Sequence, residues 1–215
     1  VVETLARRPG GYPASLAVLD AEAIIDLRGQ YFAARDTAAG DTGGALVVDK
    51  MPIRSFQVGL LWRLFPDARY VFGLRHPCDV VLSNFMQHYM PTDAFTNFLT
   101  LDGTARVYDG VMALWHLYRE KLPLAVHEVR YERLVDDLER EARALLTFLD
   151  VPWDPDVLDF NRTAEARGQI NTNSYHQVTE ALYRRASNRW KRYQGFLEPA
   201  LGRLDPHLRA FGYER

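Results

Sequence analysis

The chain has 215 residues, a formal net charge of −2, and 47% hydrophobic and 25% charged residues. These values are ordinary for a globular domain with its own core, and they exclude a general attraction to nucleic acid or anionic lipid. No apolar stretch is long enough to cross a membrane, no export signal is visible, and a single cysteine excludes an internal disulfide. We therefore expect a cytoplasmic protein in a reducing compartment.

The first part of the chain predicts two helices and one strand. Residues 14–36 carry apolar side chains at helical spacing and predict an amphipathic helix. Residues 37–44 are small, polar and rich in glycine, which is typical of a loop. Residues 45–49 form a short β-branched run between a glycine and a proline, which predicts a buried strand. A second helix is expected over 56–65.

The middle of the chain alternates between strands and helices. Residues 69–74 predict a second strand, and the helix expected over 77–88 begins with a proline, whose missing N–H is tolerated in a first turn. Apolar periodicity then predicts a helix over 107–118, a third strand over 124–130 and a long helix over 134–149. This alternation implies an α/β fold with a parallel sheet covered by helices on both faces.

Residues 161–186 interrupt the pattern. They are polar, weakly periodic and long for a connection inside a compact domain, so we expect an active-site loop there. A final helical region begins near Ser187 and runs toward Phe211, with an interruption expected at Pro199. The chain is predicted to form a single domain over residues 1–215.

Polar side chains follow each of the three predicted strands. Lys50 follows the first, Arg75 the second and Tyr131 the third. Each has an ordinary explanation by itself: a solvated lysine, an arginine paired with a carboxylate, or a tyrosine at the edge of the core. Because ligands of open parallel sheets bind beyond the carboxyl ends of the strands, the three together favour an anion site.

The segment RHPCDVVLS, residues 75–83, adds geometry to this hypothesis. Arg75 offers a bidentate fork for a phosphate, and the helix that begins after it presents free N–H groups and the positive end of its dipole. Ser83 lies two turns along that helix, where its hydroxyl can donate to the same anion. Asp79 is interpreted as a capping residue that compensates the helix dipole. The six histidines show no metal-ligand spacing, so no metal site is predicted.

The chain resembles the sulfotransferases that use 3′-phosphoadenosine 5′-phosphosulfate (PAPS), in particular the bacterial branch related to the protein-tyrosine sulfotransferases. The order and spacing of five segments carry the resemblance over about residues 45–200. These segments are VVDKMP (47–52), RHPCDVVLS (75–83), VRYERLVDD (129–137), SYHQV (174–178) and SNRWKRY (187–193). The implied fold is that of the P-loop nucleotide hydrolases, with a mostly parallel sheet as the middle of three layers.

The resemblance implies a donor-binding role for four residues. Arg75 and Ser83 match the arginine and serine that hold the 3′-phosphate of the donor. Tyr131 matches a tyrosine that lies against the nucleotide. Arg189 matches a basic residue that reaches the phosphate.

Two further residues are implied to act on the transferred group. Lys50 matches the lysine that stabilises charge on the bridging oxygen, and Ser174 matches a serine that approaches the sulfuryl group. Glu132 is expected to hold the backbone together, whereas Trp190 and Tyr193 are expected to pack.

The sequence departs from the family at its beginning. The family opens with a strand, a PRSGTT-like loop that cradles the 5′-phosphosulfate, and a helix, and no such unit occurs here. The general base of this branch is a glutamate just after that helix, and Glu3 is a poor substitute for it on an unconstrained terminus. We therefore expect the C-terminal portion of the family domain, which lacks the first strand–loop–helix unit and can be inactive alone.

The activity that the resemblance implies is transfer of a sulfuryl group from PAPS to a hydroxyl or amine acceptor, which leaves 3′-phosphoadenosine 5′-phosphate (PAP). Two alternatives stay open: a non-catalytic nucleotide-binding module of the same fold, and a phosphoryl transferase. PAPS is the expected co-substrate, without a metal. The expected partner is a small-molecule or peptide acceptor, and neither nucleic acid nor a membrane; the sequence indicates neither the acceptor nor the oligomeric state.

Overall fold

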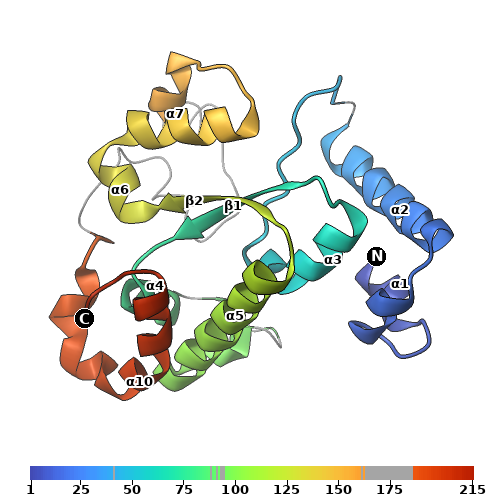
Figure 1. The fold of residues 1–215 in the computed structure, drawn as a ribbon. Helices are drawn as coiled ribbons and strands as arrows, with labels where there is room; N and C mark the ends of the chain where they lie inside the picture. Colours follow the sequence, from blue (N-terminus) through green and yellow to red (C-terminus); the bar gives the residue numbers. More distant parts are fainter. Residues whose placement is uncertain (41, 88, 91, 93–94, 161, 163–185) are drawn as a thin grey trace. The chain divides into compact units, whose positions relative to one another are not determined.

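The computed structural model describes all residues except 41, 88, 91, 93–94, 161 and 163–185. The described residues form two compact units. The first comprises Val1–Ala68 and Leu114–Ala125, and the second comprises Arg69–Ala113 and Val126–Arg215. Helix α5, Leu101–Lys121, contributes residues to both units (Figure 1).

The first unit is helical. Its elements are α1 (Val2–Ala6), η1 (Ala14–Val18), α2 (Ala21–Ala39), η2 (Pro52–Gln57), α3 (Val58–Leu64) and the last turns of α5. The helix predicted over 14–36 is thus divided at Asp20, whose carboxylate accepts a hydrogen bond from the N–H of Ala23 at 2.8 Å and caps α2. A core of aliphatic side chains joins α1, α2 and α3; its buried members are Leu5, Leu19, Ala23, Leu27, Leu60 and Leu64.

The strand predicted over 45–49 is wrong. Residues 45–51 have no regular secondary structure, and the side chains of Leu46, Val48 and Met51 are exposed. A β-branched run becomes a strand when a neighbour pairs with its backbone, and no strand within the described part of the chain pairs with this segment. The apolar run is present, but the backbone pairing that a strand needs is absent from the described residues.

The second unit contains the sheet. Strands β1 (Arg69–Leu74) and β2 (Ala125–Arg130) are neighbours in a parallel sheet, close to the bounds that the sequence predicts. Along the chain, the other elements of this unit are α4 (Pro77–Phe85), η3 (Phe95–Leu99), the first turns of α5, α6 (Tyr131–Asp136), α7 (Leu138–Leu149), η4 (Pro155–Asp159), η6 (Arg189–Tyr193) and α10 (Gln194–Ala210).

Helical segments cover both faces of this sheet. Successive side chains of a strand point to opposite faces, so the contacts of single strand residues show which segment covers which face. On one face, the ring of Phe72 packs against Phe211 at the end of α10, 6.0 Å between ring centres, and Nη2 of Arg130 donates to the Phe211 carbonyl at 2.7 Å. On the other face, His127 stacks on Phe148 of α7, 5.3 Å between ring centres. The predicted α/β fold class, with a parallel sheet, is therefore confirmed (Figure 1).

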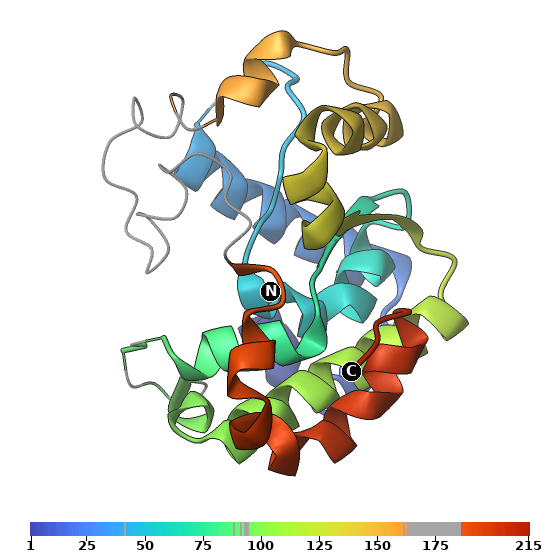
Figure 2. The same cartoon turned by 90° about the vertical axis from the view of Figure 1, so that its left-hand side faces the viewer.

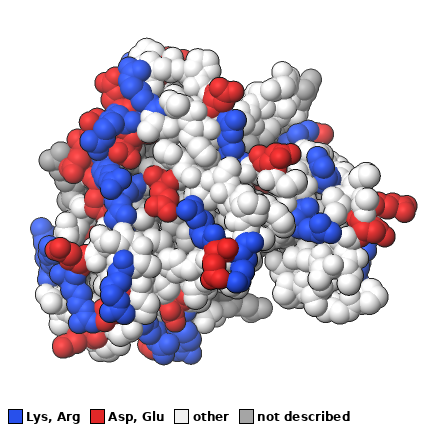
Figure 3. Space-filling model, in the orientation of Figure 1, with Lys and Arg blue, Asp and Glu red and all other residues white. Residues whose placement is uncertain are grey.

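The long helix predicted over 134–149 is two helices. The backbone of Asp137 is extended, with φ −150° and ψ 83°, and its carboxylate accepts a hydrogen bond from the N–H of Arg140 at 3.1 Å. Asp137 thus ends α6 and caps α7. The exposed side of α7 mixes charges of both signs, with Arg143 paired to Glu139 at 2.7 Å, as expected for a solvated helix face (Figure 3).

Helix α10 continues through Pro199, where an interruption was predicted. A proline inside a helix removes one hydrogen bond and brings its ring against the carbonyl four residues earlier. In α10 that earlier residue is Gly195 for Pro199 and Gly202 for Pro206, and the free backbone of glycine lets the carbonyl tilt away. The apolar side of α10 packs against α4, and both views show the two helices side by side (Figures 1 and 2).

No helix within the described ranges is both long and apolar enough to pass through a membrane.

Candidate functional site

The junction between β1 and α4 lies at the carboxyl end of the strand, where α/β proteins bind ligands. Strand β1 ends at Leu74, and α4 begins with Pro77 as its first residue. The cap of α4 is His76, whose Nδ1 accepts a hydrogen bond from the N–H of Cys78 at 3.2 Å. Arg75 therefore leaves the strand immediately before the N-terminal turn of a helix.

The guanidinium of Arg75 is held on three sides. Its Nη2 donates to the carbonyl of Ala186 at 2.6 Å, and its Cζ lies 5.0 Å from the centre of the Tyr131 ring. The same Nη2 lies 3.9 Å from Oδ2 of Asp79, close enough for attraction but too long for a hydrogen bond. Its buried Nε has no acceptor among the described residues. A cation is thus oriented at the strand end, and its buried Nε donor has no acceptor in the described part of the chain.

Asp79 does more than the sequence suggests. Its side chain is fully buried, and its Oδ1 accepts a hydrogen bond from the N–H of Trp190 at 2.7 Å. Burial raises the pKa of this carboxyl group, against the opposing effects of the Trp190 N–H, the Arg75 charge and His76. The interpretation as a helix cap is corrected: His76 caps the helix, and Asp79 binds a turn 111 residues further along the chain.

Trp190 and His76 pack behind this carboxylate. The indole of Trp190 is 1% exposed and stacks on the imidazole of His76, with ring centres 4.8 Å apart and planes inclined by 20°. Because Nδ1 of His76 accepts a hydrogen bond, Nε2 carries the proton and donates to the carbonyl of Glu214 at 2.9 Å. Burial lowers the pKa of His76, so the neutral ring is favoured. Trp190 is a packing residue, as predicted.

Glu132 joins the strand junction to the C-terminal residues. Its Oε1 accepts the N–H of His76 at 2.9 Å, and its Oε2 accepts the hydroxyl of Tyr213 at 2.7 Å. The Cζ of Arg130 lies 4.4 Å from the centre of the Tyr213 ring. The sequence-based interpretation of Glu132 as a residue that holds the backbone together is confirmed.

Four of the predicted site residues lie in this second unit. Arg75 and Tyr131 are in contact, and Arg189 is in the turn that Asp79 binds, with its Cζ 6.0 Å from the Tyr193 ring centre. Ser83 is half-buried in α4, one helical turn after Asp79 and therefore on the same side of the helix.

Of the two residues predicted to act on the sulfuryl group, one is described by the structure. Lys50 lies in the first unit, exposed, in the segment without regular secondary structure described above. The preceding Asp49 accepts hydrogen bonds from the Tyr31 hydroxyl at 3.1 Å and from Nε of Arg54 at 3.4 Å, which fixes the backbone before the lysine. Ser174 falls outside the described residues.

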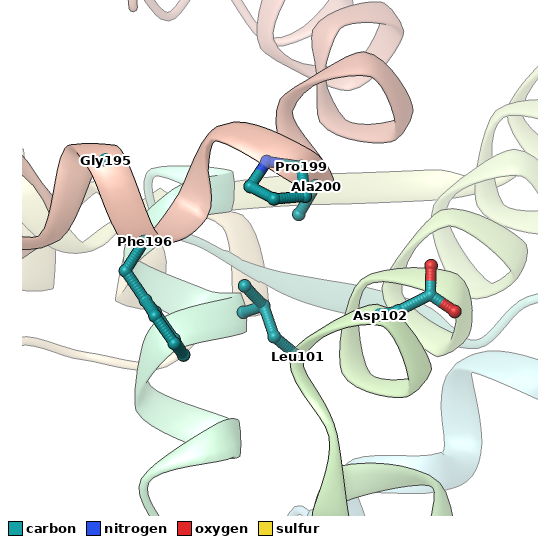
Figure 4. A pocket seen from close by; sticks show the side chains of 6 residues that line it. All are labelled: Leu101, Asp102, Gly195, Phe196, Pro199 and Ala200. Atoms are coloured by element: carbon teal, nitrogen blue, oxygen red, sulfur yellow. The ribbon is translucent and has the colours of Figure 1, made fainter.

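A cavity of about 390 Å³ lies elsewhere in the second unit, between the beginnings of α5 and α10. Figure 4 shows Leu101, Phe196 and Pro199 bordering it, with Asp102 at its rim. Among the predicted site residues that the structure describes, none lines this cavity, whose lining is mainly apolar. Within the described ranges, no group of His, Cys, Asp and Glu side chains is placed to hold a metal ion.

The fold and the junction define an α/β protein with cationic side chains at the carboxyl end of a strand. The model of the sulfotransferase family matches residues 4–155, which is most of the chain. The chain belongs to the sulfotransferase family. The match includes Lys50, Arg75, Ser83 and Tyr131 and ends before Ser174 and Arg189.

Individual relatives agree with this family. The chain is 27% identical over 201 residues to an "Uncharacterized protein" of Aquifex aeolicus, which covers 93% of the chain and 26% of that protein. It is 22% identical over 178 residues to a "Putative protein-tyrosine sulfotransferase" of Caenorhabditis briggsae, which covers 77% of the chain and 60% of that protein. The chain thus spans about a quarter of one relative and three fifths of the other.

A solved structure shows the same fold. The sulfotransferase domain from the curacin biosynthetic pathway superposes with a TM-score of 0.54 and 22% sequence identity, over 82% of this chain and 68% of that domain. At this identity the likeness concerns the fold alone.

Proposed function

We propose that this protein transfers a sulfuryl group from PAPS to a hydroxyl or amine acceptor and releases PAP. Membership of the sulfotransferase family supports sulfuryl transfer in general. The observation that carries the donor assignment is the oriented guanidinium of Arg75, held between the Tyr131 ring and the Ala186 carbonyl at the end of β1.

This arrangement suits a phosphate of the donor. The planar guanidinium presents several N–H groups in a fixed fork, and its Nε is a buried donor without an acceptor among the described residues. The Tyr131 ring also gives a nucleotide an aromatic surface. In this proposal Arg75 and Ser83 bind the 3′-phosphate, Tyr131 contacts the nucleotide and Arg189 reaches the phosphate.

The chemical step needs positioning and stabilisation of charge more than covalent catalysis, as phosphoryl transfer does. The bond between sulfur and the bridging oxygen breaks, the phosphate of PAP leaves with the electron pair, and the acceptor oxygen or nitrogen forms the new bond to sulfur and gives up its proton to a base or to water. We assign charge stabilisation on the bridging oxygen to Lys50 and an approach to the sulfuryl group to Ser174. Removal of one such contact from an oxyanion site costs about 2.7–4 kcal/mol.

The donor assignment is tested by calorimetric titration of the chain with PAP. Arg75→Ala and Ser83→Ala are expected to weaken binding by roughly tenfold or more, because each removes a hydrogen bond to a charged ligand. The matched control is Arg106→Ala, which removes an exposed arginine of α5 that pairs with Asp102. Affinities that are equal in the three variants and the unaltered chain contradict the assignment.

Activity is tested separately, with PAPS labelled in the sulfuryl group and a panel of hydroxyl and amine acceptors. Transfer of label supports the enzyme. The exposed position of Lys50, without a preceding strand, favours keeping one second candidate, a nucleotide-binding module of the same fold. That module would bind PAP with the same dependence on Arg75 and transfer no label to any acceptor.

A further inference from the structure

The buried carboxylate of Asp79 contacts two segments that are far apart in the sequence. On one side, its Oδ1 accepts the N–H of Trp190 at 2.7 Å, and the backbone of Asn188 also stabilises its charge. On the other side, its Oδ2 lies 3.9 Å from Nη2 of Arg75. One fixed negative charge thus lies between the strand end and the turn that carries Arg189.

The conformation of that turn depends on its surroundings. Asn188 has φ 57° and ψ 21°, in the left-handed region, which is uncommon for residues other than glycine, although asparagine adopts it more often than most. Such a conformation persists where contacts with the rest of the protein determine it. Asp79 supplies such contacts on both sides of Arg189, since it acts on the backbone of the preceding and of the following residue. The position of the Arg189 backbone is therefore set by a side chain of α4.

The same carboxylate lies beside the charge of Arg75 and binds the turn that carries Arg189. Two guanidinium groups that serve one anion repel each other until the anion binds. Asp79 is shielded from water, because its side chain is fully buried, so its attraction for Arg75 is screened much less than that of a surface pair. It can hold Arg75 and the Arg189 turn together while the anion is absent.

We propose that Asp79 is a positioning residue, which holds the turn 188–190 against Arg75 so that Arg75 and Arg189 act on the same phosphate. This inference rests on the proposed function, since the phosphate is that of PAPS or PAP. It extends that function, because Asp79 itself touches no ligand: a carboxylate in contact with a phosphate would weaken binding.

The direction in which one substitution changes the PAP affinity distinguishes a positioning role from a purely electrostatic effect. Asp79→Asn keeps the shape of the side chain, but it removes the charge and leaves the Trp190 N–H a neutral acceptor, whose hydrogen bond is about half as strong as one to a carboxylate. Removal of a negative charge near an anion site would by itself tighten PAP binding. Loss of the Arg189 position weakens it, and we expect a loss of roughly tenfold, equal to that of Arg189→Ala.

A double-mutant cycle on the 215-residue chain tests this coupling by calorimetry with PAP. If Asp79 acts through Arg189, the double variant binds PAP within about twofold of either single variant. Additive losses, or an Asp79→Asn variant that binds as well as the unaltered chain or better, overturn the inference. The matched control is Val81→Ala, a buried position of the same helix, which is expected to leave the affinity unchanged.

Amide hydrogen exchange without nucleotide supplies a second readout. The amide of Trp190 is expected to exchange at least about tenfold faster in Asp79→Asn than in Val81→Ala. Equal exchange rates in the two variants would mean that Asp79 does not hold the turn, and would overturn the inference whatever the PAP affinities are. If the unaltered chain binds no PAP, the proposed function is wrong, and the role of Asp79 at the phosphate is wrong with it. If PAP binding requires Arg75 but the affinity losses of Asp79→Asn and Arg189→Ala are additive, only the positioning role is wrong.

Discussion

Replacement of Glu132 by alanine removes a carboxylate that joins the β1–α4 junction to the C-terminal residues. Two donors lose their acceptor: the N–H of His76, at 2.9 Å, and the hydroxyl of Tyr213, at 2.7 Å. A hydrogen bond to a charged group contributes about 1.5–3 kcal/mol, and Glu132 is only half-buried, so the lower end of that range applies. Two such bonds predict a loss of about 3 kcal/mol in the free energy of unfolding.

The loss is measurable by heat and by urea. For a chain of this size, 1 kcal/mol lowers the Tm by about 2–4 °C, so Glu132→Ala is expected to lower it by roughly 6–12 °C. Glu132→Gln keeps one acceptor for the His76 N–H and offers its amide to the tyrosine oxygen, so it is expected to lose about 1 kcal/mol. Circular dichroism during urea unfolding gives both values.

The control is Glu139→Ala, which removes an exposed glutamate of α7 that pairs with Arg143. A surface change of this kind stays within about 0.5 kcal/mol. The reasoning is refuted if Glu132→Ala is no more destabilising than Glu139→Ala, because the bridge would then contribute no more than a surface ion pair.

Three further outcomes are expected. In a protein that transfers label from PAPS, Lys50→Ala should lower kcat far more than it weakens PAP binding, and equal losses would contradict a role in the chemical step. Burial lowers the pKa of His76, so as the pH falls below about 6.5 the unfolded chain takes up the proton first and the free energy of unfolding decreases. His76→Asn should flatten that pH dependence in urea titrations, and an unchanged slope would count against it. Burial raises the pKa of the Cys78 thiol to about 12, so a thiol reagent at pH 8 should label it only as the protein unfolds; rapid labelling of the native chain would be inconsistent with that burial.

The sequence predicted elements whose signals are local. Strands β1 and β2 and the start of α4 followed from short apolar runs and from Pro77, and the structure has them within a residue or two at those points. The strand at 45–49 failed because a strand also needs a partner, which a single segment cannot reveal. The interruption predicted at Pro199 was also wrong, because the helix continues there. The glycine four residues earlier leaves space for the proline ring, and the proline alone does not indicate this.

The candidate site divides in the same way. Arg75 and Tyr131 were predictable, because each directly follows a strand and the ends of parallel strands meet. Asp79 was not, because an aspartate in the first turn of a helix already has a sufficient local explanation, and its partner Trp190 is 111 residues away. No spacing rule connects two such positions. The six site residues named from the sequence remain predictions about function.

The contacts of the β1–α4 junction also impose an order on biosynthesis. The strand and helix can form while the chain is still on the ribosome. Their partners are translated later: Trp190, which binds Asp79, follows it by 111 residues. Tyr213, which binds Glu132, and Glu214, which binds His76, come more than eighty residues after residue 130. A nascent chain shorter than about residue 190 therefore exposes a carboxylate that no backbone amide of the turn can yet bind. Stalled or truncated products would carry an incomplete junction, which makes them candidates for chaperone binding and proteolysis.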